Sequence, residues 1–284
     1  MKKFLALILA ALMCLTVFVA CTPAAPADNA SDANLAPENN DAAPASDWEY
    51  IKTNGKLVVG MTLFAPMNYY DDDSNFVGFE TEFAKAVGEK LGVDVEFVEI
   101  DWTTKEIELA AKSIDCIWNG MTITPERAEA MSISTPYMAN KQVLVAKAEN
   151  AESYSTPGNL ADKIVVAEAE SAGEGVATGD NYFASANYVA VDTMAKALLE
   201  VSSGTADACV VDYVAAIGMI GEGTDYADLT TVDTDDFSPE EYGVAFRKGS
   251  DVTEKANAAM KALAEDGTLK AIAEKYKLDE LLLF

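Results

Sequence analysis

Short apolar runs alternate with helix-like segments between residues 56 and 276, and this alternation restricts the possible folds more than any other feature of the sequence. Residues 56–60 are an apolar run closed by glycine, which is typical of a strand. Between residues 79 and 91 apolar side chains recur every four residues, which predicts a helix with one buried face. The same reasoning predicts strands at residues 93–100, 114–118, 143–146, 164–167, 208–211 and 242–246, and helices at residues 107–112, from 125, from 172, 192–202 with Asp192 as the cap, 213–220, 251–265 and 268–276.

Strands and helices in alternation indicate an α/β fold with parallel sheets that helices cover on both faces. At 284 residues the chain is long enough for two domains of ordinary size, taken as about 150 residues each. Two rounds of alternation therefore predict two doubly wound lobes with a cleft between them. In such folds ligands bind at the carboxyl ends of the strands, so the loops that leave the strands there are candidate sites.

The first residues carry the pattern of an export signal. Met1 is followed by two lysines, residues 4–20 are apolar, and Cys21 comes next. This order predicts a signal peptide of residues 1–20, cut before Cys21, whose thiol then carries lipid at the extracytoplasmic face of the cell membrane. A transmembrane anchor is the alternative, although the apolar stretch is shorter than the ~20 residues that a spanning helix needs.

Residues 21–46 contain mainly Ala, Pro, Asp, Asn and Ser, with almost no bulky side chains. Such a segment cannot bury enough apolar surface to offset the entropy of ordering it, so we predict a flexible tether behind the lipidated cysteine. Folded structure is expected from near Trp48.

Acidic residues outnumber basic ones by 47 to 20, which gives a formal net charge of −27. This field repels nucleic acid and anionic lipid head groups, and it excludes both as partners. The chain contains no histidine, which is the commonest general base and zinc ligand. We therefore expect no metal site, no cofactor and no catalytic residues.

Two cysteines lie inside apolar runs that are typical of strands. Cys116 follows Ile-Asp, and Cys209 follows Ala-Asp-Ala. Free cysteine packs as a small hydrophobic residue, which favours buried, unpaired thiols. A disulfide between them is the alternative in an oxidising compartment.

The strongest local signal for a site is the run from Ile117 to Arg127, in which a strand is followed by a glycine-containing loop and a helix start. Thr124 is a typical N-cap, and the proline after it suits the first helical position. Arg127 in the first turn is unusual, because the helix dipole disfavours a cation there. A carboxylate ligand would explain it, since the guanidinium, the Thr122 hydroxyl and free backbone N–H groups could converge on one anion. The alternative is a surface ion pair between Arg127 and Glu126 or Glu129.

Residues 114–138 (IDCIWNGMTITPERAEAMSISTPYM) resemble the signature of family 3 solute-binding proteins, the polar-amino-acid receptors of ABC importers. The resemblance extends from about residue 57 to residue 276. It implies a type II periplasmic-binding-protein fold, with lobe 1 at residues 47–138 plus 242–284, lobe 2 at residues 139–241, and a hinge of two strand segments near 138–141 and 240–242. It also implies a monomeric receptor that captures a free amino acid by hinge closure and delivers it to the permease subunits of an importer.

The resemblance assigns roles to particular residues. Arg127 corresponds to the clamp of the ligand α-carboxylate, and Asp212 corresponds to the acid that binds the ammonium group. Asp212 could also cap the helix that follows it. Phe64 and Trp102 correspond to the residues that sandwich the ligand side chain, and ordinary core packing is the alternative for each. The remaining expected ligand contacts lie on the two loops that face the cleft: Asn119, Gly120, Met121, Thr122, Ser171 and Ala172.

Several residues depart from the family pattern and leave the identity of the amino acid open. Glu168 and Glu170 stand where relatives usually have glutamine and glycine, and they add negative charge near the carboxylate site. Either the backbone bends outward, or these acids face solvent, or they meet a cationic ligand side chain. Thr62 lies where an acidic residue is usual, which argues against a close arginine or histidine binder, and Glu80 replaces the usual aspartate.

Two other functions are compatible with the same fold. Some relatives have become enzymes, and a cyclohexadienyl-dehydratase-like activity is the first alternative. The absence of histidine and the complete set of zwitterion-binding residues argue against it. A ligand sensor that reports to a partner protein is the second. We therefore expect a binding protein for a polar amino acid, and not an enzyme.

Overall fold

The structure, a computed structural model, describes residues 46–234, 237 and 239–284. The predicted signal peptide, the lipidated Cys21 and the tether up to residue 45 lie outside the described residues. Ser46, the last residue of the predicted tether, belongs to the folded part: its hydroxyl accepts a hydrogen bond from Glu49 N (3.1 Å) and donates to Asp251 Oδ2 (2.5 Å). It thereby caps helix α1 (Asp47–Asn54), which the sequence analysis did not predict.

Two sheets organise the described residues. The first has five strands in the order β4-β1-β5-β13-β6, and the second has β11-β7-β10-β8-β9, with β12 paired to β7. Their bounds are β1 (Lys56–Met61), β4 (Asp94–Glu99), β5 (Cys116–Ile117), β6 (Ser132–Ile133), β13 (Ala245–Phe246), β7 (Met138–Lys147), β8 (Ile164–Glu168), β9 (Asn187–Val191), β10 (Ala208–Asp212), β11 (Leu229–Thr231) and β12 (Pro239–Tyr242). A short hairpin of β2 (Tyr69–Tyr70) and β3 (Phe76–Val77) stands apart from both.

The predicted parallel sheets are in fact mixed. β1 runs parallel to β4 and β5, and β8 runs parallel to β9 and β10, as the alternation predicts. By contrast, β13 is antiparallel to β5 and β6, and β7 is antiparallel to β10, β11 and β12. The antiparallel strands are those by which the chain passes from one sheet to the other, where no crossover helix intervenes.

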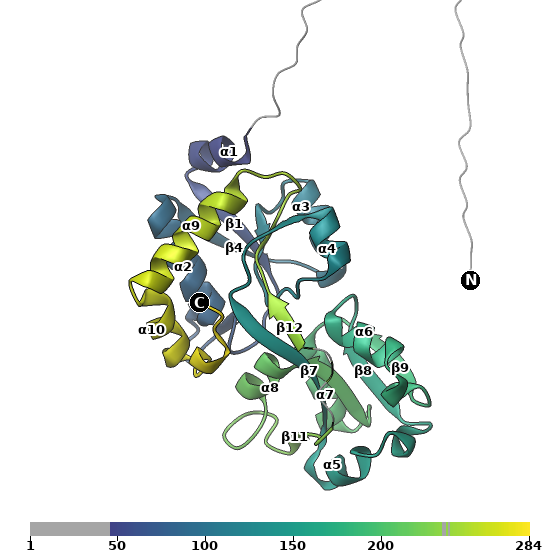
Figure 1. Cartoon of the computed structure of the whole chain (residues 1–284). Helices are drawn as coiled ribbons and strands as arrows, with labels where there is room; N and C mark the ends of the chain where they lie inside the picture. The colour runs from purple at the N-terminus through teal and green to yellow at the C-terminus, as the bar shows by residue number, and fades with distance from the viewer. Residues whose placement is uncertain (1–45, 235–236, 238) are drawn as a thin grey trace, which may run out of the picture. The chain divides into compact units, whose positions relative to one another are not determined.

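The two chain crossings lie side by side as β7 and β12 (Figure 1). Met138 pairs with Tyr242 and Lys141 pairs with Pro239 in one antiparallel ladder. The predicted single strand at residues 242–246 is therefore wrong: β12 ends at Tyr242, and β13 begins at Ala245 in the other sheet.

Helices cover the sheets and confirm most of the predicted helical segments. Their bounds are α2 (Phe79–Leu91), α3 (Lys105–Ala110), α4 (Pro125–Ala130), α5 (Ala148–Tyr154), α6 (Ala172–Gly179), α7 (Met194–Ser203), α8 (Tyr213–Met219), α9 (Val252–Glu265) and α10 (Thr268–Lys275). The predicted cap Asp192 is wrong, because the Thr193 hydroxyl accepts the bond from Lys196 N (3.0 Å) that begins α7. Helix α3 lies two residues earlier than predicted, and the chain leaves it through Lys112 at φ 62°.

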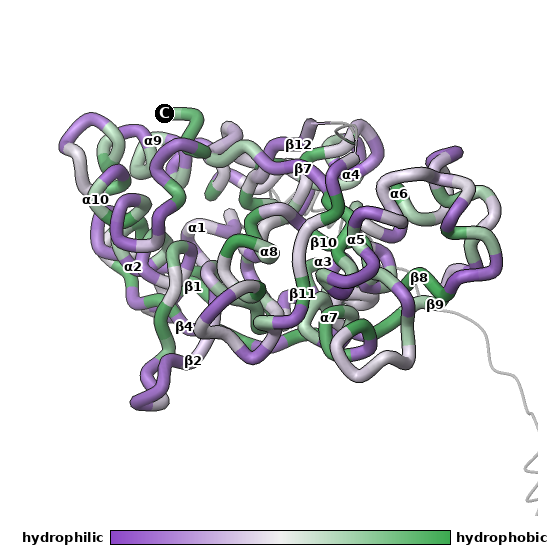
Figure 2. Tube along the Cα trace, turned by 90° about the horizontal axis from the view of Figure 1, so that it is seen from below, coloured by the Kyte–Doolittle hydropathy of each residue, from purple (hydrophilic) through white to green (hydrophobic). Residues whose placement is uncertain are grey.

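The core follows from the one-sided helices and the buried strands. Phe79, Phe83 and Val87 on one face of α2 are fully buried, as the four-residue spacing predicts. All five residues of β10 are buried, with α6 and α7 packed against it. Figure 2 shows the resulting hydrophobic stretches along strands such as β8 and β10. Among the described residues, the helices are too short or too polar to cross a membrane.

Both core cysteines are buried and unpaired, which confirms the favoured interpretation over a disulfide. Cys116 lies in β5 and Cys209 in β10, and each is fully shielded from solvent. Burial raises the pKa of both thiols above the usual range, so the reactive thiolate is suppressed.

We predict that these two thiols react with a disulfide reagent only after the protein unfolds. Counting reactive thiols with and without denaturant should show two more in denaturant, because both lie in buried strands. Cys116→Ser and Cys209→Ser should each reduce this difference by one. A thiol count that denaturant does not change would contradict the assignment.

Candidate functional site

Two loops at the carboxyl ends of β1 and β5 are joined by one side chain. The Asn119 carboxamide accepts bonds from Thr62 N (2.9 Å) and Thr62 Oγ1 (2.7 Å), and donates to Thr62 O (2.8 Å). Both residues are buried. Thr62, which stands where the family pattern has an acid, therefore holds Asn119 and with it the first residues of the 118–124 loop.

Gly120 is held by Glu80, the acid that replaces the usual aspartate of the family pattern. Its N–H donates to Glu80 Oε1 (2.8 Å), and Glu80 also accepts bonds from the Tyr137 hydroxyl and from Asn68 Nδ2 (2.8 Å). Burial raises the pKa of Glu80 to about 7. Gly120 has φ 54°, and a Cβ there would lie 3.1 Å from the Phe64 ring, so only glycine fits without displacement of its neighbours.

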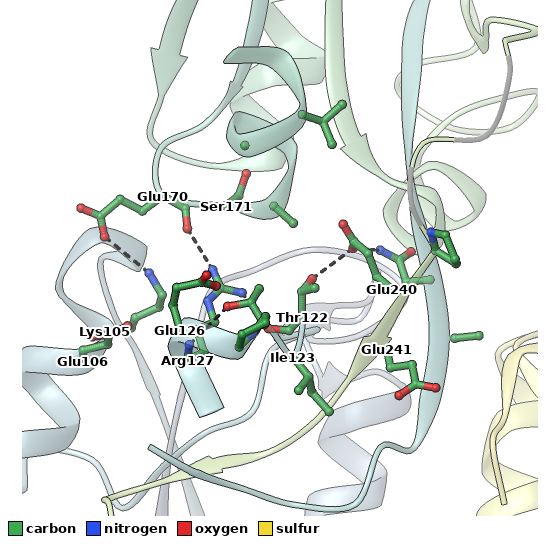
Figure 3. A pocket seen from close by; sticks show the side chains of 18 residues that line it. Lys105, Glu106, Thr122, Ile123, Glu126, Arg127, Glu170, Ser171, Glu240 and Glu241 are labelled. Atoms are coloured by element: carbon green, nitrogen blue, oxygen red, sulfur yellow. Dashed lines mark hydrogen bonds and ion pairs between the residues drawn. The ribbon is translucent and has the colours of Figure 1, made fainter. Parts of the chain in front are cut away.

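Arg127 projects from α4 toward both sheets (Figure 3). The Thr124 hydroxyl caps α4 by accepting a bond from Arg127 N (3.2 Å), as predicted. The guanidinium donates to Thr122 O (2.9 Å) and to Glu170 O (3.1 Å), the latter on the turn that follows β8. Partial burial lowers the pKa of Arg127 from its ordinary value, and the group remains a cation. Its other N–H groups remain available for an anion.

Lys105 is a second buried cation, which the sequence analysis missed. Its Nζ donates to Trp102 O (3.0 Å), lies 4.9 Å from the Trp102 ring centroid, and is 3.5 Å from Glu170 Oε2. Burial lowers the pKa of Lys105. A cation in the first turn of a helix singled out Arg127, but the helix here was predicted from residue 107, so Lys105 lay outside it and was not recognised.

The loop after β8 faces these two cations. Glu170 has φ 57°, and its exposed side chain reaches Lys105 while its carbonyl reaches Arg127 (Figure 3). Ser171 caps α6, because its hydroxyl accepts a bond from Glu174 N (3.1 Å). The backbone therefore turns at Glu170 so that its carbonyl contacts Arg127 and its side-chain carboxylate contacts Lys105.

Asp212 ends β10 as a buried carboxylate. It accepts bonds from the Tyr242 hydroxyl (2.7 Å) and from Gln142 Nε2, both neutral groups. Burial and the nearby Glu240 carboxylate raise the pKa of Asp212 to about 7. Although Asp212 occupies the N-cap position of α8, its side chain makes no capping bond. Neither of these two partners carries a positive charge that could compensate the Asp212 carboxylate.

Glu240 on β12 is another residue that the sequence analysis noted only as part of a chain crossing. Its Oε2 accepts bonds from Thr122 Oγ1 (3.1 Å), Asn140 Nδ2 (3.0 Å) and Gln142 Nε2 (3.0 Å). One carboxylate oxygen thus connects the 118–124 loop to the strand pair that joins the two sheets.

Two hollows lie between these groups. The larger, of about 870 Å³, is the one in Figure 3, and Lys105, Arg127, Glu170 and Glu240 are among its lining residues. The smaller, of about 10 Å³, adjoins it and is lined by Trp102, Asn119, Gly120, Thr122, Arg127, Glu168, Ser171, Ala172, Met194 and Asp212. This volume is close to that of a single water site, so an amino acid could enter only if the walls separate.

Eight of the ten predicted ligand-binding residues line the smaller hollow; Phe64 and Met121 line neither. Phe64 is buried behind Gly120, and Met121 packs in a core cluster with Ile117. Met194 lines the hollow and was not predicted, because an apolar residue at the start of a helix carries no signal beyond core packing.

Glu168 is the last residue of β8 and is only 2% exposed. Its Oε1 is buried and has no hydrogen-bond partner among the described residues. Burial and the Asp212 carboxylate raise the pKa of Glu168 to about 8. Within the described part of the chain, no group of His, Cys, Asp and Glu side chains could hold a metal ion.

A family model for bacterial extracellular solute-binding proteins, family 3, matches residues 57–279. The chain belongs to this family. Its fold is the type II periplasmic-binding-protein fold, as the resemblance predicted. Proteins of this family are solute-binding proteins.

Three of the proteins that this chain resembles illustrate the range. The L-cystine-binding protein TcyJ of Escherichia coli (strain K12) is 31% identical over 80% of this chain and 84% of its own. The arginine-bound ArgBP of T. maritima (Gly52Ala mutant) is 31% identical with a TM-score of 0.68, over 76% of this chain and 99% of that one. The ancestral amino acid-binding protein AncCDT-1, described as a precursor of cyclohexadienyl dehydratase, is 32% identical with a TM-score of 0.73, over 81% and 99%.

We predict that the unpartnered Glu168 makes the free energy of unfolding depend on pH. Its pKa rises from 4.5 in the unfolded chain to about 8 in the fold, so between these values the folded protein keeps a proton that the unfolded chain has lost. This contribution to stability is complete below pH 4.5 and is lost as the pH rises through 8.

Glu168→Gln should therefore be more stable than the parent at pH 8.5 by on the order of 2 kcal/mol, and equal to it near pH 4.5. Urea unfolding at both pH values, without added amino acids, measures the difference. Glu265→Gln, which replaces an exposed acid on α9, is the control for the substitution itself. An equal difference for Glu168→Gln at both pH values would contradict the assignment.

Proposed function

We propose that this protein is an extracytoplasmic receptor that binds a free amino acid between Arg127 and Asp212 and delivers it to an ABC importer. One observation carries the proposal: a guanidinium from the five-stranded sheet and a carboxylate from the six-stranded sheet line the same small hollow. An α-amino acid brings a carboxylate and an ammonium group in one molecule. The two charges of the site are therefore complementary to the two charges of the ligand.

The carboxylate would lie on the free N–H groups of Arg127, with the Thr122 hydroxyl and the Gly120 loop beside it. The ammonium would lie on Asp212, whose observed partners are the neutral Tyr242 hydroxyl and Gln142 amide. A ligand ammonium would compensate a buried charge that is otherwise costly. Trp102, Ser171, Ala172 and Asn119 would complete the contact surface, because they line the same hollow.

Capture would require hinge opening and closure of lobe 1 (residues 47–138 and 242–284) against lobe 2 (residues 139–241). The small volume of the hollow supports this, since its walls must separate to admit an amino acid. Arg127 and Lys105 already contact Glu170 across the cleft, and these contacts would form and break with closure. The paired β7 and β12 strands supply the hinge.

The lipid on Cys21 and the tether of residues 21–46 would hold the receptor, as a monomer, at the outer face of the membrane. There the closed, ligand-bound form would bind the permease subunits of the importer. The pattern of residues 1–21 supports this placement. A relative from Haemophilus influenzae, 30% identical over 78% of this chain, is named a probable amino-acid ABC transporter-binding protein, which supports delivery to a transporter.

The main rival is an enzyme related to cyclohexadienyl dehydratase, which the similarity to AncCDT-1 brings into consideration. A buried carboxyl such as Glu168 could act as an acid in that chemistry. AncCDT-1 is itself described as an amino acid-binding protein, and the charge pair of Arg127 and Asp212 favours binding. Turnover of prephenate or arogenate would overturn the receptor assignment.

A thermal-shift screen against the common amino acids tests the proposal. At 100 times Kd, a ligand that binds only the folded state adds about 2.7 kcal/mol, which raises the Tm by roughly 5–10 °C. We predict such a rise with one or a few free amino acids.

Arg127→Ala should weaken that binding by at least about 100-fold while the fold survives, because it removes the carboxylate clamp. Lys261→Ala, which removes an exposed cation on α9, is the control and should bind as the parent does. Tight binding by Arg127→Ala would show that the site has been assigned to the wrong residues.

A further inference from the structure

Glu168 differs from Glu80, Asp212 and Glu170 in the partners of its carboxyl group. Glu80 is equally buried, but its carboxylate accepts three hydrogen bonds. Asp212 accepts bonds from Tyr242 and Gln142. Glu170, two residues after Glu168, is 59% exposed and pairs with Lys105. Glu168 has a buried Oε1 without a partner in the described structure, and its side chain lines the smaller hollow.

The position of Glu168 follows from the sheet. β8 and β10 are neighbouring parallel strands, and each ends in an acid, Glu168 or Asp212. The two carboxylates therefore lie at the same edge and line the same hollow, opposite Arg127. Lys105 is the other buried cation nearby, and it is held by Trp102 O and by Glu170.

A neutral amino acid would leave one ionisable group of the site without a partner. Its carboxylate matches Arg127 and its ammonium matches Asp212, which leaves Glu168 buried and unpaired. An ionised carboxylate buried without a partner costs several kcal/mol, so Glu168 keeps its proton at neutral pH, and a cation bound beside it would let it ionise and form an ion pair. A ligand that carries a second cationic group would supply that cation.

We propose that Glu168 binds the cationic side chain of the ligand, so that the substrates of this receptor are basic amino acids. The inference rests on the proposed function and names the substrate class of the same site. Glu168 would replace, from the six-stranded sheet, the acid that is missing at Thr62 on the five-stranded sheet. The ring of Trp102 and the side chain of Met194, both lining the hollow, give apolar surface for the methylene chain of such a ligand.

The decisive comparison is between ligands of matched shape that differ in charge. Isothermal titration of the purified protein at pH 7.5 with arginine and citrulline, and with lysine and glutamine, separates charge from size. We expect the cationic member of at least one pair to bind 10-fold or more tightly than its neutral partner. Glu168→Gln should weaken cationic binding by about 10-fold or more and change neutral binding by less than about 3-fold.

Glu265→Gln is the control, because it removes an exposed acid on α9 that lines neither hollow, and it should leave the cationic-to-neutral ratio unchanged. Neutral amino acids, such as cystine or glutamine, that bind the parent as tightly as arginine and lysine would overturn the inference and leave the proposed function intact. An unchanged ratio in Glu168→Gln would do the same. If no amino acid of either class binds, the proposed function fails as well.

Discussion

The placement of Arg127 is the interaction on which the site depends, because it brings a cation to a surface where the helix dipole and partial burial both oppose one. Thr124 caps the helix below it, and Thr122 O and Glu170 O accept two of its N–H groups. Glu80 and Asn119 in turn hold the loop that carries Thr122. These contacts hold the guanidinium in one orientation, so a carboxylate ligand would meet donors that are already ordered.

Three acidic side chains lie near Arg127 where the two sheets meet. Asp212, Glu168 and Glu240 belong to three strands of the second sheet, and each contacts or lines the region where the sheets meet. Like charges in a buried space repel, which raises the pKa of Asp212 and Glu168 beyond the effect of burial. This destabilises the folded protein at neutral pH, and a bound cation would relieve it. Ligand binding and stability are thus linked through the same carboxylates.

The sequence predicted the parts of this arrangement that local patterns determine. The spacing of Phe79, Phe83 and Val87 located α2, and the cap at Thr124 located α4 and hence Arg127. Asp212 was recognisable as an acid at the end of an apolar run. By contrast, pairing between distant segments was not encoded locally. The antiparallel β7 and β13, the split at residues 243–244, and the position of Lys105 against Trp102 all depend on which segments meet after folding.

The pair Glu168 and Glu170 shows this limit most clearly. In the sequence they are two equivalent acids in one loop, and three outcomes were open for both. In the structure Glu168 ends a strand whose last residues are buried, whereas Glu170 takes φ 57° and turns its side chain outward to Lys105. Only the backbone turn separates them, and residue type alone does not predict it. Glu170 is exposed, whereas Glu168 is buried and lines the smaller hollow, so its contact with a cationic ligand stays a prediction.

The central claim is that Arg127 and Asp212 each bind one charge of the same ligand. The direct measurement is a binding cycle that titrates the ligand, its analogue without the carboxylate and its analogue without the ammonium into the parent, Arg127→Met and Asp212→Asn. We predict that removing the ligand carboxylate weakens binding strongly in the parent and little in Arg127→Met. Removing the ligand ammonium should weaken binding strongly in the parent and little in Asp212→Asn. Equal losses in the parent and in both variants would contradict it.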